Sequence, residues 1–450
     1  MTVSERHGGV LCILFLFGMS EVTFALLRHD VNDGLGFEVS YAGGTEVKPV
    51  VFLTVSSLAS RTNNVEDRII EMNWDYIAQQ DVEAEVWVKL YNADPLANHS
   101  DPLISVRPSS AGYHRTNIKY PEIAFTTENL TDTCLGFWIT YERNSEISSW
   151  NCLRARPHWM NEIRSILGNM SLIEMMIPGT HNAGSYGPFN RNEDNRFNRY
   201  LLNQEENIWS QLVYGIRYLD LRVAYHDSVN PPEKFWITHS SFRTEVPVRE
   251  AINQVKRFLN ATSEIVIMDF HRFVGGFQGQ DSVVRHQELI HLLEEELADY
   301  MIPAGFTPWV TLNSLWDVDR RLYVGYADNN ARRQSQYLFP AIKHLWGDVD
   351  KVRDLKAYLN RTVCSTRAPR GLTSAMAQLT PSTMGAIFDF YGGLRNMADA
   401  VNRQITKWFR DEWSHCANIV STDYFLGNNI IEIAIETNKR RRPLPGTVFS

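Results

Sequence analysis

The sequence lacks several features that would assign it at once to a common functional class. Its 44 Lys and Arg residues are outnumbered by 52 Asp and Glu residues, so we expect no basic surface of the kind that binds nucleic acid. The same balance gives no electrostatic attraction to an anionic membrane. The five cysteines include no closely spaced pair of the type that zinc knuckles use. Beyond the N-terminus, nothing in the sequence resembles a second membrane span or a hydrophobic anchor tail, and no internal repeat or low-complexity segment is evident.

The composition instead indicates a folded, core-forming chain. Hydrophobic residues make up 44% of the sequence, with 12 Trp and 22 Phe among them, which is ample for packed cores and argues against extensive disorder. At 450 residues, one very large domain or two ordinary domains are expected.

The N-terminus predicts export of the protein. Arg6 precedes an apolar run over 10–17, and Thr23 and Ala25 supply small residues at the minus-three and minus-one positions of a cleavage site. An N-terminal membrane anchor is the alternative, but the apolar run is shorter than the ~20 residues that a span needs. We therefore expect residues 1–25 to be a signal peptide and the protein to be secreted.

Cysteine usage and glycosylation motifs agree with this expectation. Without Cys12, which belongs to the predicted signal peptide, four cysteines remain, and four cysteines permit three pairings. The simplest pairing gives one disulfide to each of two domains, Cys134–Cys152 and Cys364–Cys416. Asn-x-Ser/Thr motifs, which suit a secreted glycoprotein, occur at Asn98, Asn129, Asn169, Asn260 and Asn360.

Residues 26–155 have the pattern of an antiparallel β-sandwich-like domain. Short β-branched or aromatic runs are separated by clusters of Asn, Asp, Gly and Pro. The runs cover 37–41, 50–55, 84–90 and 136–141. No chemistry-bearing cluster stands out in them, so a targeting or scaffold module is favoured over a second active site. The Arg154–Pro157 segment is the predicted domain boundary.

Residues 156–437 alternate between strand-like and helix-like patterns, which predicts an α/β fold with a TIM-type (β/α)8 barrel, regular or distorted. Strand-like runs cover 172–177, 216–223, 235–238, 265–270, 322–326, 374–379 and 418–421. Helical patterns cover 208–214, 248–259, 283–301 and 394–413. Residues 438–450 form a basic tail, most simply a solvated one; a proteolytic processing site or a contact with an anionic surface is the alternative.

Two histidines in short motifs carry the functional signal. An apolar run leads into Pro178-Gly179, so we expect a strand to stop there and to place His181 on the following loop. His239 ends a later strand-like run. Between the two histidines, Asp220 and Arg222 are two residues apart and therefore lie on one face of a strand. Two imidazoles, a carboxylate and a guanidinium at strand ends are the groups needed for acid–base chemistry on a phosphodiester.

Together these motifs resemble the X-box of phosphatidylinositol-specific phospholipase C, and most closely the PI-PLC X domain-containing proteins, which have a single catalytic module. The stretches that carry the resemblance are Pro178-Gly179-Thr180-His181-Asn182, Gly215-Ile216-Arg217-Tyr218-Leu219-Asp220-Leu221-Arg222 and the later His239. The resemblance runs from about Pro157 to about Thr437. It implies the same barrel fold and a phospholipid substrate at a membrane surface.

The resemblance also implies roles for these residues. His181 would be the general base that takes the proton from the inositol 2-hydroxyl group. His239 would be the general acid that protonates the leaving diacylglycerol oxygen, with Asp220 raising its pKa. The simpler alternatives are a turn-stabilising His181, a buried core histidine at 239 and a structural ion pair between Asp220 and Arg217.

Arg222 decides between two versions of the family. Calcium-dependent relatives carry carboxylates at this position, whereas bacterial-type members have Asp-x-Arg, which Asp220-Leu221-Arg222 matches. A guanidinium binds a phosphate through two N–H groups and offsets charge on its oxygens. We therefore expect calcium-independent catalysis without a metal or other cofactor. A surface salt bridge is the alternative role for Arg222.

Three further residues are assigned less directly. Asn182 departs from the bacterial pattern, since His-Asn is the calcium-type signature, so the chain mixes the two. Asp423 ends the predicted last strand, which neighbours the first in a closed barrel, and so is expected either to orient His181 or to make a barrel-rim hydrogen bond. His271 falls where bacterial members carry a lysine near the substrate, and Asp269 is either a residual calcium ligand or a strand-end cap. Asn182 and His271 are thus expected to contact substrate.

The sequence therefore predicts a secreted phosphodiesterase that splits a phosphoinositide, or a related glycerophospholipid or lipid-anchored glycan, by intramolecular attack. One alternative is a metal-dependent glycerophosphodiesterase-like or sphingomyelinase-D-like barrel, against which Arg222 and the lack of a clear acidic cluster argue. The other is a catalytically inactive X-domain that binds lipid or glycan, which only Asn182 favours.

Overall fold

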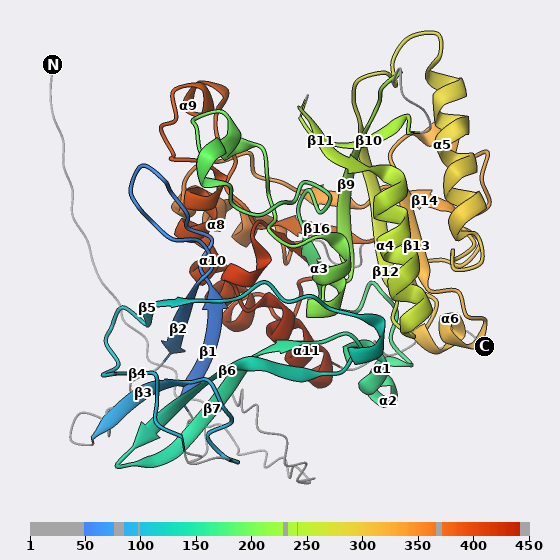
Figure 1. Ribbon diagram of the computed structural model, residues 1–450. Coiled ribbons are helices and arrows are strands. Elements are labelled where there is room, and N and C mark those ends of the chain that lie inside the picture. Colours follow the sequence, from blue (N-terminus) through green and yellow to red (C-terminus); the bar gives the residue numbers. More distant parts are fainter. Residues whose placement is uncertain are drawn as a thin grey trace, which may run out of the picture. The chain divides into compact units, whose positions relative to one another are not determined.

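The computed structural model describes residues 49–75, 85–97, 100–227, 233–240, 242–365 and 371–441, all within one compact unit (Figure 1). The predicted signal peptide, the strand expected at 37–41 and the tail beyond 441 lie outside the described residues. The predicted tail begins later than residue 438, because helix α11 (Ile430–Arg440) continues through it. None of the described helices is long and apolar enough to cross a membrane.

Two antiparallel sheets form the N-terminal region, as the strand pattern predicts. One has the order β1-β2-β5 and the other has the order β4-β3-β6-β7. Their strands are β1 (Val50–Val55), β2 (Ile69–Asp75), β3 (Val86–Tyr91), β4 (Ile104–Val106), β5 (Tyr113–Lys119), β6 (Thr133–Arg143) and β7 (Glu146–Ala155). Alternate residues of β3 are buried, which is the period of a strand with one face on a core.

The remaining strands confirm the predicted α/β fold. A parallel sheet has the order β14-β13-β12-β9-β8-β17-β16-β15. Its strands are β8 (Ile177–Thr180), β9 (Tyr218–Tyr225), β12 (Val266–Phe273), β13 (Leu322–Tyr326), β14 (Leu338–Pro340), β15 (Lys343–Leu345), β16 (Thr373–Met376) and β17 (Ile419–Thr422). The two ends of this order, β14 and β15, are separated in the chain only by Ala341 and Ile342, so the parallel sheet is a distorted TIM-type barrel.

Helices and one hairpin connect the barrel strands (Figure 1). The hairpin is β10 (Phe235–His239) and β11 (Phe242–Pro247), and β10 pairs with β9. The longer helices are α3 (Ile208–Tyr214), α4 (Val248–Ala261), α5 (Ser282–Leu297), α8 (Val352–Thr362), α10 (Leu394–Asp411) and α11. The short ones are α1 (Trp159–Glu162), α2 (Arg164–Leu167), α6 (Leu312–Asp317), α7 (Asn329–Arg332) and α9 (Thr383–Ile387). This connectivity puts the chemistry-bearing residues at the carboxyl ends of the strands.

The first barrel strand differs from its prediction. The apolar run 172–176 forms a turn, and β8 begins only at Ile177 and passes through Pro178 and Gly179. Pro178 has no N–H to donate, but its carbonyl oxygen still accepts a hydrogen bond from the amide of Arg217. Gly179 is required by close packing, since a Cβ atom there would lie 2.7 Å from the Tyr218 ring. The strand therefore ends one residue before His181.

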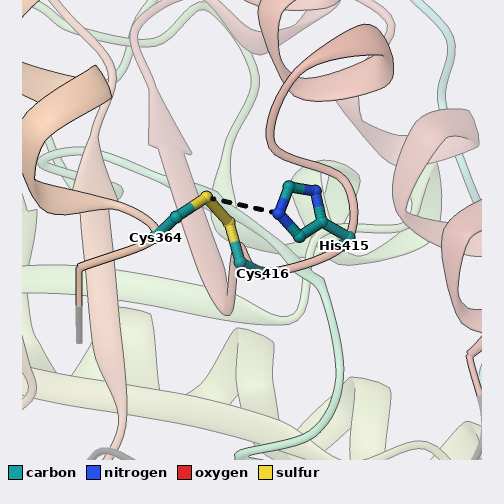
Figure 2. A group of neighbouring side chains, drawn as sticks. All are labelled: Cys364, His415 and Cys416. Carbon is teal, nitrogen blue, oxygen red and sulfur yellow. Dashed lines mark hydrogen bonds between the residues drawn. A yellow bond between two sulfur atoms is a disulfide. The ribbon is translucent and has the colours of Figure 1, made fainter. Parts of the chain in front are cut away.

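Both predicted disulfides are present. Cys134–Cys152 joins the paired strands β6 and β7, and Cys364–Cys416 joins the segments that follow α8 and α10. Figure 2 shows His415 beside the second disulfide, with its Nε2 atom 3.8 Å from the sulfur of Cys364. Disulfide formation consumes both thiols, so this group of two cysteines and a histidine holds no thiolate ligand for a metal.

Candidate active site

His181 follows β8 directly and is fixed by the strand that pairs with it. Its amide donates a hydrogen bond to the carbonyl oxygen of Thr422 in β17, and its own carbonyl oxygen accepts one from the side-chain amide of Gln204. The ring Nδ1 atom lies 2.8 Å from Oδ1 of Asp423, the residue that follows β17. First and last strands thus place Asp423 and His181 together, as their sequence positions suggest.

The partners of the His181 ring define its tautomer. A guanidinium has N–H donors and no acceptor, and one N–H of Arg222 lies 2.9 Å from Nε2 of His181. Nε2 therefore presents its lone pair, and the ring proton is on Nδ1, where it is donated to Asp423. An imidazole with a carboxylate on one nitrogen and an unprotonated second nitrogen is the arrangement that a general base requires.

Three residues next to the His181 ring make up the floor of the site: Asn182, Asp220 and Arg222. Asn182 has a φ of +46°, a left-handed conformation that asparagine tolerates, and its amide donates to Oδ2 of Asp220 at 3.2 Å. Arg222 lies 3.4 Å from the same oxygen. Three buried polar atoms here have no protein partner: Oδ1 of Asn182, Oδ1 of Asp220 and Nε of Arg222. Unsatisfied buried polar atoms at one place mark a site that a polar ligand completes.

The fixed charge of Arg222 governs the ionisation of Asp220. Burial by itself would raise the pKa of the Asp220 carboxyl, but Arg222 and, after it, His344 and His181 hold that pKa well below its usual range. Asp220 is therefore an anion throughout the physiological pH range. Its charge offsets that of Arg222 and leaves the guanidinium positioned between a carboxylate and the lone pair of His181.

His239, at the end of β10, lies in the same site but is not paired with Asp220 as we expected. Its Nδ1 atom donates to the carbonyl oxygen of Leu201 at 3.0 Å. Its pKa is lowered to about 4, first by burial and then by the neighbouring His181 and Arg222, while Asp423 is the carboxylate that opposes the shift. The expected partnership is wrong because the Asp220 carboxylate is directed at Asn182 and Arg222 instead. His239 is neutral in the free protein, with its Nε2 lone pair unprotonated.

A second polar cluster lies on the neighbouring strands. Oδ2 of the fully buried Asp269 accepts hydrogen bonds from the Tyr218 hydroxyl at 2.9 Å and from Nδ1 of His271 at 3.2 Å, and Tyr218 also contacts Nε2 of His344 at 2.9 Å. In the register of β12 on β9, Asp269 is opposite Asp220. The cluster therefore adjoins the floor of the site.

Asp269 has a clear structural role in this cluster. Its Oδ1 atom accepts the backbone amide of Ile342 at 3.1 Å, in the break between β14 and β15. Strands β14 and β15 are the two ends of the strand order and are not paired with each other, so this contact closes the barrel between them. It agrees with the capping role that is one of the two expectations for Asp269. The pKa of Asp269 is lowered: burial alone would raise it, but the hydrogen bonds from His271 and His344 outweigh that effect. The pKa of His271 is raised because its bond to Asp269 outweighs burial.

Neither of the two three-ligand clusters among the described residues is a ready metal site. One is the Cys364–His415–Cys416 group, whose thiols are oxidised, and the other is Asp269, His271 and His344. The rings of His271 and His344 stack 3.4 Å apart with an interplanar angle of 6°. Because a nitrogen lone pair lies in the ring plane, an ion shared by both rings would lie well out of both planes. Neither cluster includes Asp220.

The sequence does not reveal several site residues. Asn203 donates to Asp423 at 3.1 Å and accepts from the Asn182 amide at 3.0 Å, and so connects the two residues on either side of His181. Gln204 and His344 are also contributed by segments with no motif of their own. Asn and Gln in a long loop carry no periodic signal, so only the tertiary fold identifies them.

A pocket lies next to the segments that carry Asn203 and Asp423. It has an empty volume of about 540 Å³ including its open mouth, and its lining includes Leu202 and Tyr424, each adjacent in sequence to a site residue. Arg199 and Arg395 also line it.

Comparison with known proteins supports the resemblance seen in the sequence. No protein-family model matches the chain. Human PI-PLC X domain-containing protein 1 is 24% identical over 322 residues, which cover 66% of this chain and 97% of that protein. Mouse PI-PLC X domain-containing protein 2 is 28% identical over 291 residues, covering 59% and 83%. The variant-surface-glycoprotein phospholipase C of Trypanosoma brucei brucei is 24% identical over 302 residues, covering 56% and 80%.

Solved structures give a weaker likeness. A mutant of the phosphatidylinositol-specific phospholipase C from Staphylococcus aureus has 14% identity and a TM-score of 0.48, covering 64% of this chain and 98% of that one. The enzyme from Listeria monocytogenes has 18% identity and a TM-score of 0.45, covering 62% and 98%. The resemblance itself is confirmed by the sequence relatives: this chain is related to the PI-PLC X domain-containing proteins over 59–66% of its length.

Proposed function

We propose that this protein is a phospholipase C-like phosphodiesterase that cleaves a phosphoinositide, or a related glycerophospholipid or lipid-anchored glycan. The observation that carries the proposal is the orientation of His181, whose Nδ1 contacts Asp423 while its Nε2 lone pair faces Arg222. That arrangement supplies a base and a phosphate-binding cation at one point. The relative from Trypanosoma brucei brucei, whose name is that of a phospholipase C, adds support.

The reaction begins when the phosphate displaces the guanidinium from His181. Arg222 then donates two N–H groups to the non-bridging oxygens, and Nε2 of His181 takes the proton from a hydroxyl next to the phosphate on the head group. The resulting oxygen attacks phosphorus, and the bond from phosphorus to the diacylglycerol oxygen breaks. His239 gives a proton to that oxygen. The products are diacylglycerol and a cyclic phosphate, which water opens in a second, slower step.

His239 needs the substrate to become an acid. In the free protein its pKa is lowered to about 4 by burial and by the neighbouring His181 and Arg222. An anionic phosphodiester bound between these groups neutralises Arg222 and adds a negative charge beside the ring, and both effects raise the pKa of His239. Protonation of His239 is therefore coupled to substrate binding.

Catalysis in this account does not use calcium. An ion site needs several oxygen ligands around one point, and here the cation of Arg222 is in hydrogen-bond contact with both Asp220 and His181. A divalent ion beside a fixed guanidinium would be repelled. The free Oδ1 atoms of Asn182 and Asp220 are then available to hydroxyl groups of the head group.

A catalytically inactive, lipid- or glycan-binding protein is the second candidate. Two observations favour it: the neutral His239 of the free protein and the Asn at 182. Incubating the purified protein and its His181→Ala variant with mixed phospholipids, with and without chelator, and identifying the products by mass separates the two. Lipid cleavage by the wild type alone supports the enzyme, whereas binding by both without any product supports the inactive protein.

Export of the protein is part of the same proposal. The two disulfides and the exposure of the described sequon residues Asn129, Asn169, Asn260 and Asn360 support it, because oligosaccharide acceptors must be accessible. Recovery of the protein from the medium with a mass that falls on deglycosylation tests this part.

A further inference from the structure

One short segment of the barrel region, residues 203–206, contacts the pair that orients the His181 ring. Its first residue, Asn203, donates a hydrogen bond to Oδ1 of Asp423 at 3.1 Å. Its second residue, Gln204, donates one to the carbonyl oxygen of His181 at 2.9 Å. A shift of this segment would therefore move Asp423 and His181 relative to each other.

The other half of the segment is bound by Arg68, the residue that precedes β2 in the N-terminal region. Its Nη1 atom lies 2.8 Å from Oε1 of Glu206 and 3.4 Å from Oε2 of Glu205. The side chain of Arg68 is only 4% exposed, and both carboxylates are nearly as deeply buried. Charges screened from water in this way attract each other more strongly than exposed ones, and removal of one partner leaves buried charge uncompensated.

Arg68 is itself fixed by the N-terminal region. Its Nε atom donates to the carbonyl oxygen of Tyr120 at 3.2 Å and its Nη2 atom donates to that of Pro121 at 3.3 Å. The amide of Tyr120 donates in return to the carbonyl oxygen of Arg68 at 2.7 Å. The guanidinium is thus a rigid cation that the N-terminal region presents to the segment 203–206.

The backbone conformation of Arg68 is unfavourable for an arginine. Its φ is +58°, in the left-handed region that glycine or asparagine adopts more easily. Strained residues of this kind persist where the surrounding structure holds them, and they are frequent at functional sites. The arginine is therefore explained by what its guanidinium binds, since its backbone favours other residue types.

Other ion pairs between the N-terminal sheets and the barrel helices do not involve this segment. Glu71 in β2 is 1% exposed and lies 3.0 Å from a guanidinium nitrogen of Arg403 in α10. Among the residues that the structure describes, neither Glu71 nor Arg403 makes a hydrogen bond or ion pair with 203–206. Arg68 differs because the carboxylates that it binds directly follow, in the chain, the two residues that contact the active site.

We propose that Arg68 is a positioning residue, which fixes the segment 203–206 and through it aligns His181 with Asp423. The inference rests on the proposed function. It gives the N-terminal sheets a part in catalysis beyond that of a scaffold, because the cation that fixes the segment belongs to them.

A double-mutant cycle tests the proposal on a short-chain phosphatidylinositol. Arg68→Met should lower kcat at least ~10-fold with KM nearly unchanged, because misplacement of a catalytic pair by ~1 Å slows the chemical step. Asn203→Ala removes the contact with Asp423 directly. If Arg68 acts through the segment, the two losses overlap, and Arg68→Met should change kcat little in the Asn203→Ala background. Losses in kcat that multiply would overturn the proposal.

Arg403→Met is the matched control, since it breaks a buried ion pair between the same two regions. Both variants should unfold at lower denaturant concentration than the wild type, but only Arg68→Met should lose kcat. Arg68→Lys should regain most of the lost kcat, because a single nitrogen of Arg68 makes both carboxylate contacts. If Arg68→Met does not fold, Glu206→Gln makes the isosteric change on the other side of the pair. Equal loss of kcat in the control would overturn the proposal.

A signal from the His181 ring separates this proposal from the proposed function. In full-length protein labelled with ¹⁵N-histidine, the ring N–H resonance that is absent from His181→Ala reports the hydrogen bond to Asp423. It should shift in Arg68→Met and keep its wild-type position in Arg403→Met. An unshifted resonance in Arg68→Met would overturn the positioning role. A shifted resonance together with a wild-type protein that has no turnover would refute the proposed function and leave the positioning role standing.

Discussion

Oδ1 of Asp423 lies 2.8 Å from Nδ1 of His181, so the residue after the last barrel strand orients the residue after the first. The geometry depends on the pairing of β17 with β8. It fixes which ring nitrogen carries the proton, and it leaves the other nitrogen directed at Arg222.

Asp423→Asn should therefore reduce catalysis without loosening the fold. An asparagine amide can donate a proton to Nδ1 and so favour the wrong tautomer, with the proton on Nε2. We expect kcat to fall at least ~10²-fold, and His181→Ala to lose at least as much. Asp354→Asn, a change of the same charge at a surface position, is the matched control. A mutant of Asp423 with wild-type kcat would show that the contact is only structural.

A substrate with a good leaving group distinguishes the roles of the two histidines. A nitrophenol needs little protonation as it leaves, so His239→Ala should regain much of its lost rate on a nitrophenyl ester, whereas His181→Ala should not. The ratio of rates on the natural and the activated substrate is the measurement. Equal loss on both substrates for the two variants would contradict the assignment of base and acid.

The lowered pKa of His239 predicts a pH dependence of stability. Burial and the neighbouring His181 and Arg222 hold this pKa at about 4, below the ordinary value of ~6.5, so between these two pH values the unfolded chain binds a proton that the folded one does not. The contribution of neutral His239 to the free energy of unfolding is complete above pH ~6.5. It is lost progressively as the pH falls from ~6.5 to ~4. His239→Gln should remove this contribution. Thermal unfolding of both proteins from pH 7 to pH 4 should show a smaller drop for the variant, and parallel curves would refute the shift.

Arg222 should not be replaceable by lysine. Its contacts with His181 and Asp220 use one guanidinium nitrogen, and the rest of the fork remains for phosphate oxygens. A lysine supplies the charge but not the two parallel donors, so Arg222→Lys should lose ~10²-fold or more in kcat/KM. Arg222→Asp restores the carboxylate that calcium-dependent relatives have at this position, so added calcium should raise its rate of lipid cleavage. A fully active Arg222→Lys enzyme would contradict the bidentate binding of phosphate by Arg222.

The contact that closes the barrel is tested at Gly325. A Cβ atom at this glycine would lie 2.4 Å from Oδ1 of Asp269, the oxygen that binds the Ile342 amide. Gly325→Ala should cost about 1–3 kcal/mol of unfolding free energy. Gly305 has no atom within 4 Å of the corresponding position, so Gly305→Ala is the control and should leave stability nearly unchanged. Denaturant unfolding of both variants is the measurement, and equal stability would contradict the closing role of Asp269.

Strongly patterned elements could be predicted from the sequence almost to the residue. The predicted helix 208–214 is α3, because Asn207 caps its first turn and Gly215, at a φ of +123°, ends it. The predicted strand 322–326 is β13, a continuous apolar run buried between neighbouring strands. These signals are local, and local signals survive folding when the tertiary contacts agree with them.

Other parts could not be predicted, for physical reasons. Strands β14 and β15 have three residues each, too few for any periodic pattern. The partner of His239 is a backbone carbonyl oxygen, that of Leu201, and no residue type in the sequence marks it. Asp220 is expected to be that partner from its predicted place at the end of the preceding strand, yet it is the third residue of β9, and its carboxylate is taken by the Asn182 amide and by Arg222.

The most direct test of the account follows phosphorus through the reaction. Phosphatidylinositol is incubated with the purified wild-type protein in excess chelator and the products are followed by ³¹P NMR, with His181→Ala as the control. The account predicts a cyclic inositol phosphate as the first product of the wild type and no product from the variant. A requirement for added calcium, or an open-chain monophosphate as the first product, would contradict the account.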